Sequence, residues 1–284
     1  MVPTQSRPTP DTRVERTGSG AAPLVSSPMS TDEPQHRTGP QTIPRPAQHR
    51  VGGPAPWGDL PSDVRSSLPL AGVVAAMGNR DRTEGTGKVT PFSRTFADAF
   101  ADADPAAVLV ALFEEAGETR VLLTVRSSRL RSHQGEVAFP GGKLDGDERI
   151  EDGALREAAE EVGLDPATVT VIGHLTAMPT VSSNTLMTPV VAVLDARPDT
   201  TPAPDEVARI FDVALVDLVA DGVWAEELWA VPGRSGSAGA TGSEFPVWFF
   251  SVAGETVWGA TARVLTELLC LVLAVPGPSS AGRY

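Results

Sequence analysis

Three glutamates beside an arginine are the side chains of this sequence best suited to chemistry. Arg156, Glu157, Glu160 and Glu161 lie in a segment whose apolar residues recur at helical spacing. On a helix, residues three and four apart project from neighbouring positions, so the three carboxylates share one side. Such like charges repel one another, and Arg156 offsets only part of that repulsion. A divalent cation would offset more, and carboxylate oxygens suit Mg²⁺ or Mn²⁺. A solvated acidic helix face is the alternative.

The helix that carries these glutamates is predicted over 150–162. Gly163 stands where a left-handed C-terminal cap is expected, and Pro166 follows closely. The apolar positions that would face a core are Ile150, Ala154, Leu155, Ala158 and Val162.

Strands and helices are mixed around this helix, which predicts an α/β fold. Apolar runs predict strands at 106–113, 120–126, 136–139, 168–175, 187–194, 227–231 and 247–252. Gly117 places a hairpin turn between the first two. Helical patterns cover 60–77, interrupted by Pro61 and Pro69, part of 206–219, and 257–274.

Composition divides the chain into four parts. Residues 1–56 are rich in Pro, Ser, Thr and Arg, and this predicts a disordered tail, because such a segment buries too little apolar surface to offset its ordering entropy. An N-terminal extension is predicted at 57–103, the main domain at 104–275, and a frayed terminus at 276–284.

Charge and cysteine content narrow the class of protein. The net charge of −13 disfavours a general nucleic-acid binder. Cys270 is the only cysteine, so no intramolecular disulfide forms, and its apolar surroundings predict a buried structural thiol. The apolar stretch 264–275 is too short to span a bilayer, and no signal-peptide core is present. A cytoplasmic protein without membrane contact is expected.

The segment from Gly142 to Leu164 resembles the Nudix box, Gly-x5-Glu-x7-Arg-Glu-U-x-Glu-Glu-x-Gly-U, where U is apolar. The resemblance implies a mixed β-sheet sandwiched between α-helices and a hydrolase that cleaves a pyrophosphate linkage. It implies that Glu157, Glu160 and Glu161 hold Mg²⁺ or Mn²⁺ and that the Gly142 carbonyl approaches the metal. Glu161 or Glu157 would act as the base, and the sequence does not choose between them. Arg156 and Glu148 would pair and orient the helix.

A second motif directly upstream is similar to the signature of the coenzyme A pyrophosphatase branch of that family. It runs from Leu122 into Gly142 as Leu-Leu-Thr-x-Arg-Ser-x3-Arg-x3-Gly-x3-Phe-Pro-Gly-Gly. Guanidinium groups bind phosphate by charge-assisted hydrogen bonds. The resemblance therefore implies substrate contacts from Arg126, Arg131, His133 and Gly135. The expected reaction converts coenzyme A, or a derivative, to 3′,5′-ADP and 4′-phosphopantetheine.

Smaller features bear on the same branch. Trp-Gly-Ala-Thr-Ala at 258–262 resembles the start of its last helix, whereas Ser-Ser-Asn at 182–184 departs from the Ser-Gly-aromatic expected there. Asp205 and Glu206 stand where an additional acid could join the metal site. Members of the family are often dimers, so a homodimer is one expected state.

Two other functions compete. Pro179, fifteen residues past Leu164, lies near a proline associated with ADP-ribose specificity, which favours hydrolysis of another nucleoside diphosphate derivative. A binding or regulatory module that has lost catalysis usually lacks some box carboxylates, and this chain keeps all of them. A serine hydrolase is disfavoured because no Gly-x-Ser-x-Gly elbow is present.

Overall fold

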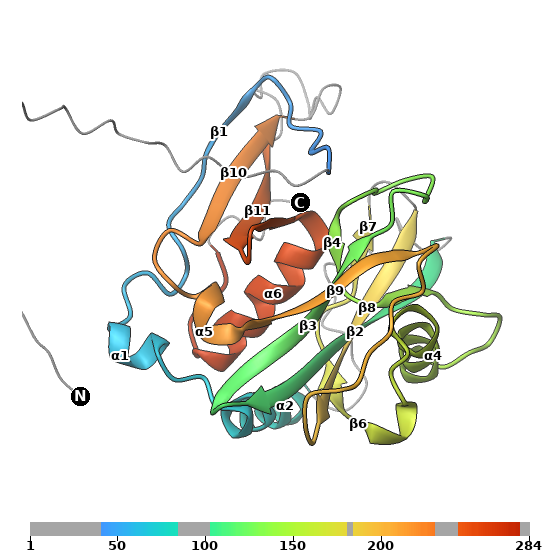
Figure 1. The fold of residues 1–284 in the computed structure, drawn as a ribbon. Coiled ribbons are helices and arrows are strands. Elements are labelled where there is room, and N and C mark those ends of the chain that lie inside the picture. The colour runs from blue at the N-terminus through green and yellow to red at the C-terminus, as the bar shows by residue number, and fades with distance from the viewer. Residues whose placement is uncertain (1–40, 85–102, 181–183, 231–243, 279–284) are drawn as a thin grey trace, which may run out of the picture. The chain divides into compact units, whose positions relative to one another are not determined.

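The computed structural model describes residues 41–84, 103–180, 184–230 and 244–278. Two β-sheets and several helices make up these residues (Figure 1). The predicted α/β class is confirmed.

The larger sheet is mixed and positions the glutamate helix. Its centre is β2 (Asp104–Glu115), which pairs parallel with β8 (Thr185–Leu194) and antiparallel with β3 (Glu118–Arg126). Ala116 and Gly117 form the predicted hairpin turn, both with positive φ, as a two-residue turn between twisted strands requires. The remaining strands are β4 (Val137–Ala138), β5 (Gly141–Lys143), β6 (Val169–His174), β7 (Met178–Thr180) and β9 (Val207–Ala214).

A smaller antiparallel sheet lies beside it in the structure. Its strands, in spatial order, are β1 (His49–Val51), β10 (Trp224–Ala230), β11 (Glu244–Val252) and β12 (Glu255–Trp258). Both faces of this sheet carry aromatic side chains, so it belongs to the packed core. The sequence patterns predicted two of these strands but not a separate sheet.

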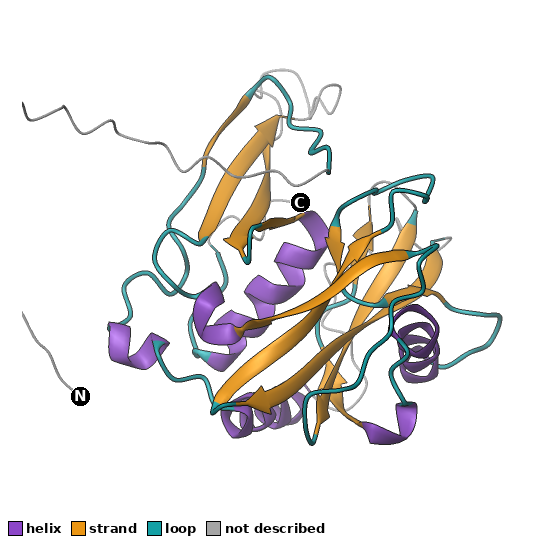
Figure 2. Cartoon of the chain, in the orientation of Figure 1, coloured by secondary structure: helices purple, strands orange, loops and turns teal. Residues whose placement is uncertain are grey.

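Helices cover both faces of the larger sheet (Figure 2). Alternate residues of β2 point to opposite faces: Leu109 packs with the apolar side of α4 (Ile150–Val162), and Val110 packs with α6 (Gly259–Val272). The short η1 (Pro166–Thr168) follows α4. The α6 face also receives α2 (Leu70–Glu84) and α5 (Leu215–Leu218), while α1 (Ser62–Arg65) precedes α2. The predicted sandwich of a mixed sheet between helices is confirmed.

Ordered structure begins earlier than the predicted tail allows. Within residues 41–56, His49–Val51 pairs with β10, and the Gln41 amide donates to the Thr256 carbonyl at 2.6 Å. A disordered tail reaching residue 56 is therefore wrong for these residues. Composition missed them because three backbone pairs on a sheet edge need few apolar side chains. Residues 1–40 lie outside the described part.

The segment 206–219 is partly helical, as predicted, but most of it is a strand that the sequence patterns did not predict. Residues 207–214 form β9 along β3, and only Leu215–Leu218 is helical. Backbone pairing with β3 decides the outcome, because the sequence pattern of this segment is compatible with a helix and with a strand. The Gly/Ser-rich residues 233–243, between the strands predicted at 227–231 and 247–252, lie outside the described residues.

Cys270 is buried, as predicted, and burial raises the pKa of its thiol to about 12. In the part of the chain that the structure describes, no helix is both long and apolar enough to cross a membrane.

Candidate active site

Helix α4 presents two sides with different roles. Ala154, Ala158 and Val162 are fully buried against the larger sheet. At the C-terminal end Gly163 adopts φ 70° and donates its N–H to the carbonyls of the last turn, as the cap signal predicted. The helix begins and ends where the sequence indicated, and the glutamates lie on it.

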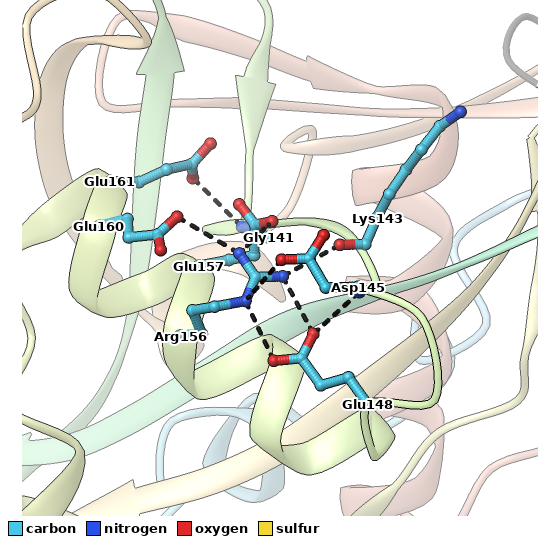
Figure 3. A network of polar contacts seen from close by, with 8 residues as sticks. All are labelled: Gly141, Lys143, Asp145, Glu148, Arg156, Glu157, Glu160 and Glu161. Carbon is cyan, nitrogen blue, oxygen red and sulfur yellow. Dashed lines mark hydrogen bonds and ion pairs between the residues drawn. The ribbon is translucent and has the colours of Figure 1, made fainter.

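Arg156 is the centre of the polar network on this helix (Figure 3). Its Nε and Nη2 each lie 3.0 Å from one oxygen of Glu148, a two-point contact. Nη1 donates to Glu157 at 2.9 Å and to Glu160 at 3.3 Å, and Nη2 donates to the Lys143 carbonyl at 3.1 Å. The predicted pairing of Arg156 with Glu148 is present. No pattern in the sequence predicts the contact between Arg156 and the Lys143 carbonyl.

Glu148 is further fixed by the loop that precedes α4. It accepts the Asp145 N–H at 3.1 Å, and the Arg156 guanidinium together with this N–H lowers the pKa of its carboxyl. The charged form of Glu148 therefore fastens the loop to the helix, which supports an orienting role.

Glu161 is the buried acid of the site, with only 4% of its surface exposed. One carboxylate oxygen accepts the Gly141 N–H at 3.1 Å (Figure 3). Burial is the main cause that raises the pKa of Glu161 to about 7, with smaller increases from the charges of Glu206 and Glu157. The Gly141 N–H and the Arg126 charge act in the opposite direction. A carboxyl held at this pKa can take or release a proton near neutral pH.

Glu157 lies directly against the backbone of Gly142. A Cβ added to Gly142 would stand 2.5 Å from Glu157 Oε1, so no larger residue fits there without moving the carboxylate. Desolvation raises the pKa of Glu157, although Arg156 partly opposes the rise. The glycine is thus required by a close approach between the loop and a carboxylate.

Replacing Gly142 by Ala is expected to lower turnover at least about tenfold with little loss of fold, because the added methyl displaces Glu157 from the site. Steady-state kinetics and a thermal melt would measure this. Gly78→Ala on α2 is the matched control, since a Cβ there meets nothing within 4 Å. Equal activity of the two variants would contradict a role for Glu157 at this position.

Arg126 ends β3 on the same side of the sheet as Glu161. Its Nε is buried and has no hydrogen-bond partner in the described part of the chain. Its charge nevertheless lowers the pKa of Glu161, so the two side chains are close enough to interact electrostatically. A buried guanidinium nitrogen without a partner is costly unless something binds it.

The segment 201–206 connects α4, which carries the glutamates, to the loop that follows β3. Thr201 and Ala203 donate their N–H groups to the last carbonyls of α4, at Val162 and Glu161. At its other end the Glu206 carbonyl accepts the Ser127 N–H at 2.8 Å. This places the charge of Glu206 within reach of Glu157 and Glu161, whose pKa values it raises. Asp205 instead pairs with Arg129, at 2.8 Å.

The other residues predicted to bind substrate lie on the loop after β3. Gly135 is buried with φ 69° and donates to the Arg126 carbonyl at 3.0 Å, which closes the loop. Arg131 is exposed. His133 Nδ1 lies 3.0 Å from a Glu136 oxygen. The structure therefore brings Arg126 to the glutamates, and it leaves Arg131 and His133 on the outer loop.

The three glutamates are not equally suited to bind a hard divalent cation. Glu157 and Glu161 are desolvated carboxylates with raised pKa values, and a cation would stabilise their charged forms. Glu160 is 62% exposed and turns toward Arg156. Among the described residues no group of three or more His, Cys, Asp or Glu side chains converges closely enough to hold a metal ion. Arg156 explains this, because it draws Glu157 and Glu160 to its own guanidinium.

A family model, several curated proteins and several solved structures match this chain. A family model described as the NUDIX domain matches residues 103–229. The chain is similar to Nudix hydrolase 22, chloroplastic, of Arabidopsis thaliana, with 38% identity over 181 residues that cover 60% of this chain and 56% of that protein. It is similar to the peroxisomal coenzyme A diphosphatase NUDT7 of Mus musculus, with 46% identity over 110 residues, 38% of this chain and 46% of that protein.

A bacterial relative is covered more completely. The uncharacterized Nudix hydrolase NudL of Citrobacter koseri is 37% identical over 167 residues, which cover 57% of this chain and 80% of that protein. By contrast, the chain spans about half the length of the two Arabidopsis thaliana relatives, 56% and 55%. Among solved structures, the Nudix hydrolase RenU from M. smegmatis matches with a TM-score of 0.36 and 28% identity, over 42% of this chain and 74% of that one.

Proposed function

This chain belongs to the Nudix hydrolase family, and from that premise we propose that it hydrolyses the pyrophosphate bond of coenzyme A or a derivative of it. The products would be 3′,5′-ADP and 4′-phosphopantetheine, or its acylated form. The motif from Leu122 to Gly142 supports this substrate, as does the similarity to a coenzyme A diphosphatase.

The buried Nε of Arg126, without a partner and close to Glu161, is the observation that carries the proposal. A phosphate oxygen of the substrate would complete its hydrogen bonding and remove the cost of leaving it unpaired. The same position would bring the pyrophosphate next to the glutamates. One residue thus connects the substrate motif to the hydrolytic motif.

Nudix hydrolases generally need a divalent metal ion, and we propose that Mg²⁺ or Mn²⁺ serves here. Glu157 and Glu161 would hold it, with Glu160 and the Gly142 carbonyl as the further ligands that the motif implies. When bound, such an ion neutralises charge on the pyrophosphate and polarises the attacking water. Glu161 or Glu157 would accept the proton of that water, and the Arg156–Glu148 pair would hold the helix in register.

The test is release of 3′,5′-ADP from coenzyme A by the purified full chain. Reactions would contain Mg²⁺, Mn²⁺ or a chelator, with ADP-ribose and a dinucleotide as parallel substrates. Metal-dependent release from coenzyme A above the other substrates is expected. Activity on ADP-ribose alone would favour hydrolysis of another nucleoside diphosphate derivative, the alternative that Pro179 in β7 suggests. No activity on any of these substrates would favour a binding module.

Arg131→Ala is expected to raise the KM for coenzyme A about tenfold while kcat changes little. Arg131 is exposed on the loop after β3, so a contact with an outer phosphate would add binding energy uniformly to substrate and transition state. Initial-rate kinetics would measure both constants. Arg149→Ala, an exposed arginine that pairs with Glu151, is the control, and an unchanged KM for Arg131→Ala would count against a phosphate contact.

A further inference from the structure

β3 ends in a β-bulge directly beside Arg126. Val125 pairs with Arg209 of β9, whereas Arg126 pairs with Val207, so the register of the two strands shifts between these residues. A bulge bends its strand and changes the direction of the side chains beside it. The direction of the Arg126 side chain therefore depends on how firmly the end of β3 is held.

The backbone of Arg126 is bonded to the residues that precede β4. Its N–H donates to the Glu136 carbonyl at 2.9 Å, and its carbonyl accepts the Gly135 N–H at 3.0 Å. The next residue, Val137, begins β4 and pairs with Val125. The position of Arg126 therefore follows the position of β4.

A segment from a distant part of the chain holds β4. This segment, the β12–α6 corner, comprises residues 255–261, which form β12 and the start of α6. The Thr261 hydroxyl of the corner donates to the Val137 carbonyl at 3.0 Å. Thr261 and Val137 are both buried, so the loss of this hydroxyl would remove a donor from a carbonyl that is shielded from water, which is costly.

The β12–α6 corner also contacts β9, on the other side of β3. The Arg209 guanidinium donates to an oxygen of Glu255, whose side chain is only 13% exposed. Val125 pairs with Val137 on one side and with Arg209 on the other, and Figure 1 shows β4 and β9 beside the end of β3. The corner therefore holds both neighbours of the residue that precedes Arg126.

We propose that Thr261 and Glu255 are positioning residues, which hold the end of β3 so that the Arg126 guanidinium stays where a phosphate of the substrate would bind. This inference rests on the proposed function, because it assigns Arg126 to the substrate. The glutamates of α4 are held separately, by the packing of that helix and by Arg156. Loss of either corner contact should therefore weaken substrate binding and change the hydrolytic step little.

Thr261→Val removes the hydroxyl at nearly constant size. It is expected to raise the KM for coenzyme A about fivefold while kcat changes by less than about twofold. Thr261→Ser, which keeps the hydroxyl, should restore the wild-type KM. Glu255→Gln, which weakens the pair with Arg209, should raise KM in the same direction, and it tests the proposal independently if Thr261→Val does not fold.

Thr266→Val is the matched control on the same helix. The buried Thr266 hydroxyl accepts the Trp224 indole N–H at 3.1 Å and donates to the Ala262 carbonyl at 2.8 Å, so its loss should cost stability without releasing β4. A partly unfolded enzyme has fewer active molecules, which lowers the apparent kcat at an unchanged KM. Thr266→Val should show only that pattern. An unchanged KM in both Thr261→Val and Glu255→Gln would overturn the proposal.

A double variant tests whether Thr261 acts through Arg126. In an Arg126→Gln background, Thr261→Val should raise KM no further, because the guanidinium that it positions is already absent. A full additional rise in the double variant would contradict the proposal.

Amide hydrogen exchange separates this inference from the proposed function, because it needs no substrate. Exchange across residues 124–138 should be several times faster in Thr261→Val than in the wild type, and Thr266→Val should not share this change. If the wild-type chain releases no 3′,5′-ADP from coenzyme A, the proposed function fails. The exchange rates then decide alone whether Thr261 holds the end of β3, and equal rates in the wild type and Thr261→Val would overturn the inference.

Discussion

Glu161→Gln is expected to lower turnover by a factor on the order of 10³ while leaving the fold intact. Glutamine keeps the size of the side chain and can still accept the Gly141 N–H, so packing should change little. It can neither carry the charge that a divalent cation needs nor accept a proton from water. Single-turnover and steady-state rates with Mg²⁺ and Mn²⁺ would measure the loss.

The same variant is expected to be more stable than the wild type at pH 8 when metal is chelated. Folding raises the pKa of Glu161 from 4.5 to about 7, so the folded state binds its proton more tightly than the unfolded state. Protonated Glu161 makes its full contribution to the stability of the fold below pH 4.5. That contribution is lost as the pH rises through about 7. Glutamine does not titrate, and the gain at pH 8 should be about 1–3 kcal/mol in the free energy of unfolding.

Glu151→Gln is the control. It makes the same change from Glu to Gln near the N-terminal end of α4, where Glu151 contacts Arg149 and His174. It should keep nearly full turnover. Denaturant melts of the three proteins at pH 5 and pH 8 would separate the effects. A fully active Glu161→Gln protein would refute the assignment of this acid to the site.

Arg156→Gln is expected to reduce both activity and stability. The substitution leaves Glu148, Glu157 and Glu160 without the cation between them and the Lys143 carbonyl without its donor. Because Arg156 is 27% exposed, solvent offsets part of the loss, and about 1–3 kcal/mol of stability should disappear. Turnover should fall about 10- to 100-fold, since the orientation of Glu157 depends on this contact.

Two further variants test the cause. Arg156→Lys keeps the charge but not the two-point contact with Glu148, so it should recover stability only in part. The double variant Arg156→Gln, Glu148→Gln should be less destabilised than the sum of the two single changes, because each removes the same pair. Additive losses in this cycle would show that Arg156 and Glu148 act independently.

Local sequence determined the elements whose signals lie within a few residues. The span of α4 follows from apolar spacing and from Gly163, and the hairpin between β2 and β3 follows from Gly117. The pairing of Arg156 with Glu148 was implied by the resemblance of the motif to the Nudix box, and the structure shows it. These features depend on backbone preferences and short-range contacts that the residues carry with them.

Only the tertiary structure distinguished the glutamates from one another. Glu160 and Glu161 are neighbours in the sequence, yet the first is 62% exposed at its side chain and the second is only 4% exposed. The difference arises because α4 packs on a sheet whose strands come from distant parts of the chain. Burial against that sheet sets the pKa of Glu161, and no local pattern encodes it.

Long-range pairing likewise decided the remaining elements. β9 forms because β3 offers it a partner, and β1 forms because β10 does, although their own residues predicted a partial helix and a disordered tail. Separate backbone hydrogen bonds between distant residues hold the segment 201–206 between α4 and Ser127, which brings Glu206 toward Glu157 and Glu161. The sequence thus determined which side chains are available for chemistry. Contacts between distant segments decided which of them are buried together, because burial and backbone pairing depend on partners far away along the chain.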